Sequence, residues 1–520
     1  MSISLVRPHL FVTAISTRTS RLFWTFALTH LVLWTIVPTL TSPNAPLDVI
    51  EGYAWGREWL LGTYKHPPMQ SWWLQILAIL TNRAPWAHFF ASQVAVLGAF
   101  WGVWQTGRRM MSETAALIGV MLLEAIVYYN FTSVEFNPNV LQLPFWSLIA
   151  YSFHRAVKDN SYRHWILLGV WSAGGLYTKY STGLLLIALS SLMLIEPLAR
   201  HRLKSFGPYI AVFVAFALFV PHLIWLNNHD YLPFAYTMDR LHTAKPHAMP
   251  NFIFAPMVLI TGQLVVLLGF ALLFLVFYGR NGTTRDDRSD AFDQAFLTTV
   301  TFGPFLLTLL IAGVGGFAVR DMWGTPFWSF LGIWAIAQFH PSFSQESLTR
   351  FVYAWSVAFF AVLLVYLTSN IIYPYVEEKT GRIHFPGKAL ANYVTDVWHD
   401  RYHQPLRFVI GDTWPAGNVA YYAAERPHVF IMGDKEISPW IKSGDLDRYG
   451  GAIVWCVRHC LGAQHQSDQA PDFIKEKFPN AEIQPPFTLA RQTEADVEPV
   501  KMGWAIVPPK DTTPSTPYNP

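Results

Sequence analysis

Long apolar runs bounded by charged residues, proline or asparagine recur along the first 370 residues of the chain. A bilayer core is about 30 Å thick and takes roughly 20 apolar residues in a helix, so each run of this kind predicts a membrane-spanning helix. Eleven runs are found, near residues 22–40, 86–106, 113–133, 138–156, 163–178, 182–198, 207–227, 252–278, 294–313, 326–340 and 351–371. Residues 1–371 are therefore predicted to form a polytopic α-helical membrane domain.

The pattern changes after residue 371. Short apolar, β-branched runs at 407–412, 428–434 and 451–457 alternate with amphipathic stretches such as PAGNVAYYAAE and SDQAPDFIKEKF. This alternation predicts a small α/β domain over residues 372–509. The remaining residues, 510–520, are rich in proline and threonine and are expected to be disordered.

Composition supports this division into two parts. The chain is 52% hydrophobic and only 14% charged, with a mean hydropathy of +0.26, which excludes an ordinary soluble protein of 520 residues. Residues 370–520 carry 15 Lys and Arg and 18 Asp and Glu, against 22 and 16 in the rest of the chain. The polar residues are thus concentrated at the C-terminal end.

Basic residues on short loops predict the sidedness of the chain. They cluster before residue 22 and near residues 108, 155–163, 200–204 and 280–288. All of these clusters lie on the same side of the membrane if SWWLQILAIL, residues 71–80, does not cross the bilayer. This run is too short to cross it. We therefore expect a cytoplasmic N-terminus without a cleavable signal. The loops 41–85, 228–250 and 314–325 and the C-terminal domain should lie on the outer side.

The two cysteines, Cys456 and Cys460, both fall in the outer domain. An oxidising compartment permits a disulfide between them, although a spacing of four residues is not diagnostic of one. His459 and His465 lie nearby, but the spacing matches no structural zinc motif.

The loop between the first two predicted spans contains the highest concentration of candidate catalytic residues. At 100° per residue, Asp48, Glu51, Trp55 and Glu58 would share one face of a helix beginning just after Asp48. The same spacing of Asp48 and Glu51 fits a capping box, in which both acids only stabilise the start of the helix. Both interpretations stay open, and they are compatible with each other.

Basic residues close the same loop. Lys65 and His66 precede Pro67 and Pro68. Transfer of a sugar from a sugar phosphate needs a carboxylate that accepts the acceptor's proton and a cation that stabilises the departing phosphate. This loop contains residues of both kinds. His66 could equally be a surface histidine fixed by the two prolines. The tryptophans of this region fit a membrane-interface belt better than sugar stacking, although Trp55, Glu58 and Tyr64 stay candidate sugar or interface contacts.

Two further cations are placed on the outer face by the predicted topology. Lys179 ends a span in YTKYST, and Arg320 opens RDMWGTPFW before another. Both are candidates for binding a donor phosphate, since arginine in particular binds phosphate bidentately. The alternatives are snorkelling of either side chain at a helix end or an ion pair between Arg320 and Asp321.

The loop sequence DVIEGYAWGREWLLGTYKHPP, residues 48–68, followed by WWL, resembles the first outer loop of glycosyltransferase family 39. This family includes bacterial relatives of protein O-mannosyltransferases and the lipid A aminoarabinose transferase. FNPNVLQLPFWSLIAY (136–151) and YTKYSTGLLLI (177–187) agree in order. The resemblance covers about the first 340 residues and, more loosely, the outer domain.

The resemblance implies a GT-C fold with about eleven transmembrane helices in a bacterial cytoplasmic membrane. It also implies transfer of a hexosyl or pentosyl group from a polyprenyl-phosphate donor to an envelope lipid, glycan or protein hydroxyl outside the membrane. Asp48 matches the family's first acid and would be catalytic. The family's second acid usually adjoins the first, but Val49 stands there, and Glu51 is the nearest substitute.

No cofactor is required by these residues. A divalent ion held by Asp48, Glu51 and Glu58 through oxygen ligands is conceivable but unassigned, and no motif points to a nucleic acid or to a nucleotide-sugar donor. Two rival functions are a transporter or glycolipid flippase and a non-catalytic glycolipid-binding relative. Transporters carry ionisable groups at mid-membrane depth, whereas here these groups gather at one surface.

Overall fold

The computed structural model describes residues 18–242, 250–277, 289–317 and 319–510. The expected disorder of 511–520 falls outside these residues. The chain forms two compact units. The first comprises residues 1–36, 64–69 and 89–365, and the second comprises residues 37–63, 70–88 and 366–520. The predicted domain limits at 371 and 509 stay predictions.

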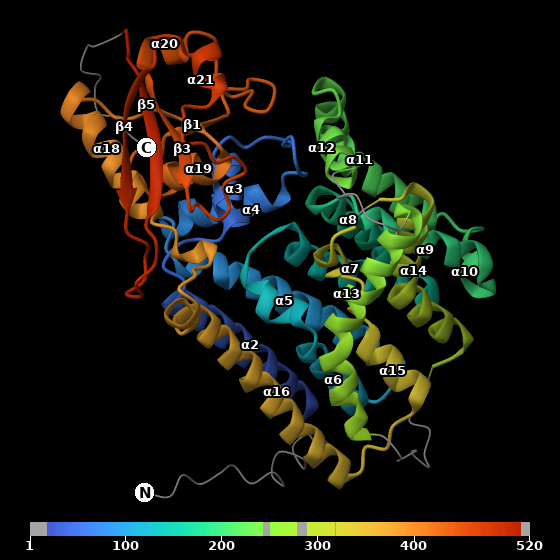
Figure 1. The fold of residues 1–520 in the computed structure, drawn as a ribbon. Coiled ribbons are helices and arrows are strands. Elements are labelled where there is room, and N and C mark those ends of the chain that lie inside the picture. Colours follow the sequence, from blue (N-terminus) through green and yellow to red (C-terminus); the bar gives the residue numbers. More distant parts are fainter. Residues whose placement is uncertain (1–17, 243–249, 278–288, 318, 511–520) are drawn as a thin grey trace, which may run out of the picture. The chain divides into compact units, whose positions relative to one another are not determined.

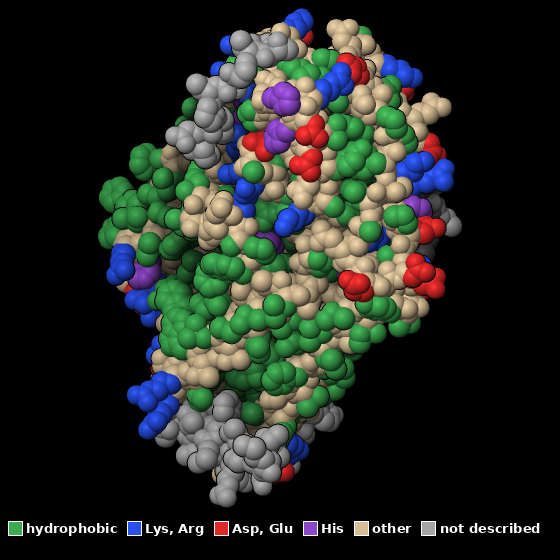
Figure 2. All heavy atoms as spheres, turned by 90° about the vertical axis from the view of Figure 1, so that its left-hand side faces the viewer, with side chains coloured by type: hydrophobic (Ala, Val, Ile, Leu, Met, Phe, Trp, Pro, Cys, Tyr) green, Lys and Arg blue, Asp and Glu red, His purple; other side chains and the backbone are tan. Residues whose placement is uncertain are grey.

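Six helices of the described chain are long and apolar enough to cross a membrane. They are α2 (Thr19–Thr41), α5 (Trp86–Gly107), α11 (Gly207–Asn228), α13 (Asn251–Phe274), α14 (Ala291–Gly315) and α16 (Gln345–Ile371). Trp24, Leu28, Val32 and Ile36 recur every four residues on α2 and are 40–49% exposed. This spacing makes one apolar stripe, as expected for a helix face in contact with lipid. Figure 2 shows hydrophobic side chains gathered over α2 and α16.

The predicted count of eleven spans is not confirmed. The run 113–133 forms two helical pieces, Glu113–Ala125 and Val127–Val134, that meet at 93°. The run 326–340 contains only α15 (Leu331–Phe339), which at 1.5 Å per residue is about 14 Å long. The remaining runs form α7 (Pro138–Asp159), α8 (Tyr162–Thr178), α9 (Thr182–Ile195) and the short α10 (Pro197–Arg202).

Buried polar side chains inside the first unit are paired with one another. His30, on α2, hydrogen-bonds Glu124 at 3.0 Å and Gln93 at 2.9 Å. His154, on α7, hydrogen-bonds Asp293 at 2.7 Å, and Lys158 donates to the same carboxylate at 2.9 Å. Pairing lowers the cost of burying such groups, so these contacts tie neighbouring helices together.

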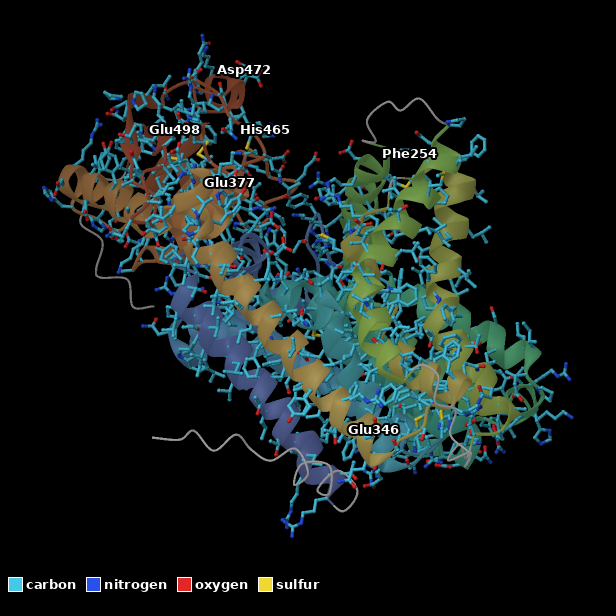
Figure 3. All side chains as sticks on the ribbon, turned by 60° about the horizontal axis from the view of Figure 1, so that its bottom comes forward. Phe254, Glu346, Glu377, His465, Asp472 and Glu498 are labelled. Atoms are coloured by element: carbon cyan, nitrogen blue, oxygen red, sulfur yellow. A yellow bond between two sulfur atoms is a disulfide. The ribbon has the colours of Figure 1, made fainter. Side chains whose placement is uncertain are left out.

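The starts of α13 and α16 lie at opposite ends of the helical bundle. Figure 3 labels Phe254 near the beginning of α13 and Glu346 near the beginning of α16. Helices α13 and α16 therefore begin at opposite ends of this bundle.

The second unit contains a five-stranded sheet with the order β2-β1-β3-β5-β4 (Figure 1). The strands β1 (Phe408–Gly411), β2 (His428–Ile431) and β3 (Gly451–Arg458) are parallel and match the three predicted runs. The antiparallel strands β4 (Glu482–Leu489) and β5 (Val500–Val507) complete the sheet. Cys456 and Cys460 form a disulfide at the end of β3.

Helices α17 (Tyr373–Glu377), α18 (Gly387–Tyr402), α19 (Thr413–Tyr422), α20 (Asp445–Tyr449) and α21 (Asp472–Lys477) accompany the sheet. Two helices from the first outer loop join them, α3 (Leu47–Gly56) and α4 (Met69–Thr81). The α3 helix packs on α19 so closely that a Cβ on Gly417 would lie 2.7 Å from Ile50. The first outer loop and the C-terminal sheet thus share one unit.

Candidate functional site

Residues 64–69 of the first outer loop belong to the first unit, where they meet α12 (Leu232–His242). The Nζ atom of Lys65 lies 5.8 Å from the centroid of the Tyr236 ring. Tyr64 approaches the same ring edge-on, with centroids 5.7 Å apart. Two segments separated by about 170 residues in sequence are therefore joined through one tyrosine. Helix α12, which falls within the stretch predicted to lie on the outer side, thus contributes to the same site as Lys65.

Lys179 is the C-cap of α8. Its Nζ atom donates a hydrogen bond to Oδ1 of Asn139, at the start of α7, at 2.5 Å. It also lies 5.2 Å from the ring centroid of Trp323. The ammonium group thus contacts an amide oxygen and an aromatic face.

His66 lies close enough to Lys65 and Lys179 to sense both charges. His66 is half-buried. Loss of hydration, followed by the charges of Lys65 and Lys179, holds the pKa of His66 well below its ordinary value. His66 is therefore a neutral imidazole near pH 7 and can donate one hydrogen bond without adding charge.

Arg240 is a further cation at this place that no sequence motif singled out. Its Nε atom donates to the hydroxyl of Tyr236 at 3.0 Å, and its guanidinium carbon lies 5.5 Å from the centre of that ring. The available signal was the spacing of four residues between Tyr236 and Arg240, which places both on one helix face. The site thus gathers Lys65, Lys179 and Arg240 around aromatic rings.

Arg320 is exposed and precedes the short helix η5 (Asp321–Gly324), which carries Trp323. Asp321, its suspected ion-pair partner, has its backbone carbonyl fixed by Gln263 Nε2 at 3.0 Å and by the Tyr128 hydroxyl. Among the described residues, no ion pair joins Arg320 to Asp321. The predicted phosphate-binding role of Arg320 stays a prediction.

The predicted acids lie in the second unit. Helix α3 begins at Leu47 with Pro46 as its N-cap, and no side chain caps it. Asp48 is therefore the second residue of the helix, and the capping-box interpretation of Asp48 and Glu51 is wrong. The backbone carbonyl of Asp48 accepts a hydrogen bond from Gln70 Nε2 at 2.8 Å. Glu51 is only 3% exposed.

The expected stripe of three carboxylates is shorter than predicted. Helix α3 ends at Gly56, so Glu58 follows the helix instead of sharing its face, and its Oε1 accepts a hydrogen bond from His428 at 2.7 Å. Trp55 is only 2% exposed, which excludes it from an interfacial belt. Asp48 and Lys65 lie in different units, and their expected pairing stays a prediction.

No group of three or more His, Cys, Asp or Glu side chains is arranged to hold a metal ion within the described part of the chain. The carboxylates of Asp48 and Glu51 are oxygen ligands of the kind that Mg²⁺ or Ca²⁺ prefers. Two such groups alone do not assign a site, and a divalent ion stays unassigned.

Known proteins resemble the chain in both sequence and fold. Residues 65–225 match the family described as dolichyl-phosphate-mannose-protein mannosyltransferase. Lipopolysaccharide core galacturonosyltransferase RgtA of Rhizobium johnstonii is 22% identical over 424 residues, 80% of this chain and 83% of that protein. Lipid A galacturonosyltransferase RgtD of the same organism is 22% identical over 41% of this chain and 45% of its own length.

The crystal structure of ArnT from Cupriavidus metallidurans bound to undecaprenyl phosphate has the same fold. It aligns with a TM-score of 0.58 at 12% identity, covering 95% of this chain and 99% of that chain. The family match, the relatives and this shared fold identify the chain as a multi-pass membrane glycosyltransferase that is similar to family 39 and has the GT-C fold.

Proposed function

We propose that this glycosyltransferase moves one sugar from a polyprenyl-phosphate carrier to a lipid or glycan acceptor of the bacterial envelope, on the outer side of the cytoplasmic membrane. The observation that carries the proposal is the cluster of Lys65, Lys179 and Arg240. Several cations gathered beside aromatic rings in a membrane protein are suited to binding a phosphate that is attached to a membrane lipid.

In the proposed reaction, the bond between the sugar C1 and the phosphate oxygen breaks while a bond forms between C1 and the acceptor hydroxyl oxygen. The acceptor proton passes to the carboxylate of Asp48, and the bonding electron pair leaves with the polyprenyl phosphate. Lys65 and Lys179 stabilise the charge that develops on this phosphate. No further reactant is needed for atoms and charge to balance.

Each remaining residue has a distinct part in the proposal. Neutral His66 donates a hydrogen bond to a phosphate oxygen, and Arg240 and Arg320 add positive charge around the carrier. Glu51, buried one turn after Asp48, acts as the second acid in place of the neighbouring carboxylate that Val49 replaces. A divalent ion is not needed for this scheme.

The similar proteins support the choice of substrates. ArnT was crystallised with undecaprenyl phosphate, which favours a polyprenyl-phosphate donor. RgtA and RgtD are named as transferases to lipopolysaccharide core and lipid A. We therefore propose a hexosyl donor, of the uronic acid class, and an acceptor within lipopolysaccharide.

The test is turnover in proteoliposomes that contain the full-length protein, a radiolabelled undecaprenyl-phosphate sugar and lipopolysaccharide. Labelled acceptor should form with the unmodified chain and fall to background with Asp48→Asn. Lys475→Gln is the matched control, because Lys475 is an exposed cation on α21. Movement of intact donor across the bilayer without a labelled product would instead support a flippase.

A further inference from the structure

A cleft of about 1050 Å³ opens within the second unit. Its walls come from α4, from the residue that follows α3, from the end of α18 and the segment after it, and from the segment after α19 up to the start of β2. The lining includes Arg57, Gln75, Ile79, His399, His403 and Arg426. Pockets for drug-sized ligands measure roughly 300–1000 Å³, so this cleft has room for more than a single phosphate ion.

The guanidinium groups of Arg57 and Arg426 form one wall of the cleft, here called the arginine wall. Arg426 donates a hydrogen bond to Oε1 of Gln75 at 3.0 Å, which fixes it against α4. Arg83 is not among the residues that line the cleft and donates to the backbone carbonyls of Tyr421 and Ala423. Burial lowers the pKa of Arg83, and Arg57 lies near enough for its charge to act in the same direction.

The tyrosines beside these arginines do not neutralise them. Tyr53 is 3% exposed and packs against Tyr421 with ring centroids 5.0 Å apart. Burial raises the pKa of both phenols, so both stay protonated and uncharged at neutral pH. An anion bound at Arg57 and Arg426 would therefore be stabilised by the nearby positive charge.

Two carboxylates near the cleft, those of Glu58 and Glu425, are bonded to histidines that line it. Glu58 accepts from His428 at 2.7 Å, and Glu425 hydrogen-bonds His399 at 3.0 Å and accepts from the backbone N–H of Leu406 at 3.2 Å. Asp400 also lines the cleft and is exposed. The arginine wall is thus the place that suits a negatively charged group.

The cleft opens next to an apolar surface of α4. This 13-residue helix is about 20 Å long, and it buries Gln70, Leu74 and Gln75 against the rest of the unit. Its other face exposes Trp73, Ile76, Ile79 and Leu80 by 45, 36, 64 and 75%. A helix of this kind lies in a membrane interface with its apolar face in the lipid, and Ile79 belongs both to that face and to the cleft.

We propose that this cleft binds the phosphorylated headgroup of an acidic glycolipid acceptor. Arg57 and Arg426 hold a phosphate of that headgroup, and the acyl chains lie along the exposed face of α4. The cleft would thereby select the acceptor, while the cations around Tyr236 hold the donor. This inference rests on the proposed function, which supplies the lipid acceptor.

The binding test uses the full-length protein in phosphatidylcholine nanodiscs, with lipid A that bears both phosphates as the probe. The same lipid A without phosphates is the paired ligand. We expect affinity for the phosphorylated form to fall roughly tenfold in each of Arg57→Gln and Arg426→Gln, as for one lost charge-assisted contact. Arg401→Gln, which breaks an exposed pair with Glu482 on the same domain, should leave affinity unchanged.

Several results would overturn the assignment. Equal binding of both forms of lipid A, or unchanged affinity in both arginine variants, would show that Arg57 and Arg426 do not bind a phosphate of the headgroup. Complete displacement of lipid A by millimolar inorganic phosphate would assign the cleft to a free anion instead of a lipid. Should Arg426→Gln misfold through loss of its bond to Gln75, Arg57→Gln alone decides the question.

Turnover separates this inference from the proposed function. In Arg57→Gln the KM for the acceptor should rise while kcat and donor binding stay near those of the unmodified chain. If the unmodified chain binds lipid A through these arginines but transfers no sugar, the proposed function fails and the cleft stands. If it transfers sugar with an unaltered acceptor KM in Arg57→Gln, the cleft assignment fails and the proposed function stands.

Discussion

Lys179 and Asn139, forty residues apart, are joined by a hydrogen bond of 2.5 Å between Nζ and Oδ1. This contact links the C-terminal end of α8 to the N-terminal end of α7. It fixes the position of a cation whose long side chain would otherwise lose conformational entropy on binding a ligand. A preorganised charge of this kind is effective in stabilising a transition state.

Replacement of Lys179 should therefore impair chemistry more than binding. We expect Lys179→Gln to lower kcat roughly 100-fold, the order observed when one preorganised donor to a developing anion is removed. Asn139→Ala should have a smaller effect, because the ammonium group remains but is less firmly held. Single-turnover rates with saturating acceptor measure both, and an unchanged rate in Lys179→Gln would remove it from the site.

Glu51 and Asp48 should differ in their sensitivity to replacement. Asp48→Asn should abolish turnover if Asp48 accepts the acceptor proton, whereas Glu51→Gln should leave a measurable rate if Glu51 only supports it. Because Glu51 is 3% exposed, its variant also requires a measured melting temperature. Equal loss of activity with unchanged melting would assign both acids to the reaction.

The pH dependence of stability should carry a signature of His66. Its folded-state pKa is lowered, so between about pH 6.5 and the lower folded pKa the unfolded chain binds a proton that the folded chain does not. Stability contributed by this site should thus fall as the pH drops below about 6.5. Melting temperatures of the unmodified chain and His66→Gln, compared at pH 7.5 and 5.5, should show a smaller decrease in the variant.

Gly417 should not tolerate a side chain. A Cβ there would meet Cγ2 of Ile50 at 2.7 Å, whereas a Cβ on Gly183 of α9 would meet nothing within 4 Å. We expect Gly417→Ala to destabilise the protein by about 1–3 kcal/mol through overpacking. Gly183→Ala is the control and should melt no lower than the unmodified chain, since alanine favours helix. Thermal unfolding in detergent measures both.

Sequence patterns predicted the elements whose own residues determine them. Strands β1, β2 and β3 were recognised because their residues are continuously apolar, as parallel strands buried on both faces are. Strand β4 was not recognised, since EIQPPFTL contains Pro485 and Pro486. Proline is tolerated there because β4 is an edge strand with β5 as its only neighbour in the sheet order.

The site was predicted less completely for a different reason. Lys65, His66 and Lys179 were selected from their places in short motifs, and the structure brings these three together. Arg240 was missed because it lies near Lys65 only through their shared contact with the Tyr236 ring. This proximity depends on the tertiary placement of a helix that is distant in sequence. The predicted start of α3 was two positions too late, which was enough to suggest a cap that does not form.

The packing of α3 against α19 makes the first outer loop depend for its support on the polar C-terminal domain. Ile50 lies two positions after Asp48 and rests on Gly417, almost four hundred residues later in the chain. A truncated version ending after the last apolar span would strip the acid-bearing turn of its support. The polar C-terminal domain thus forms the support for the helix that carries Asp48.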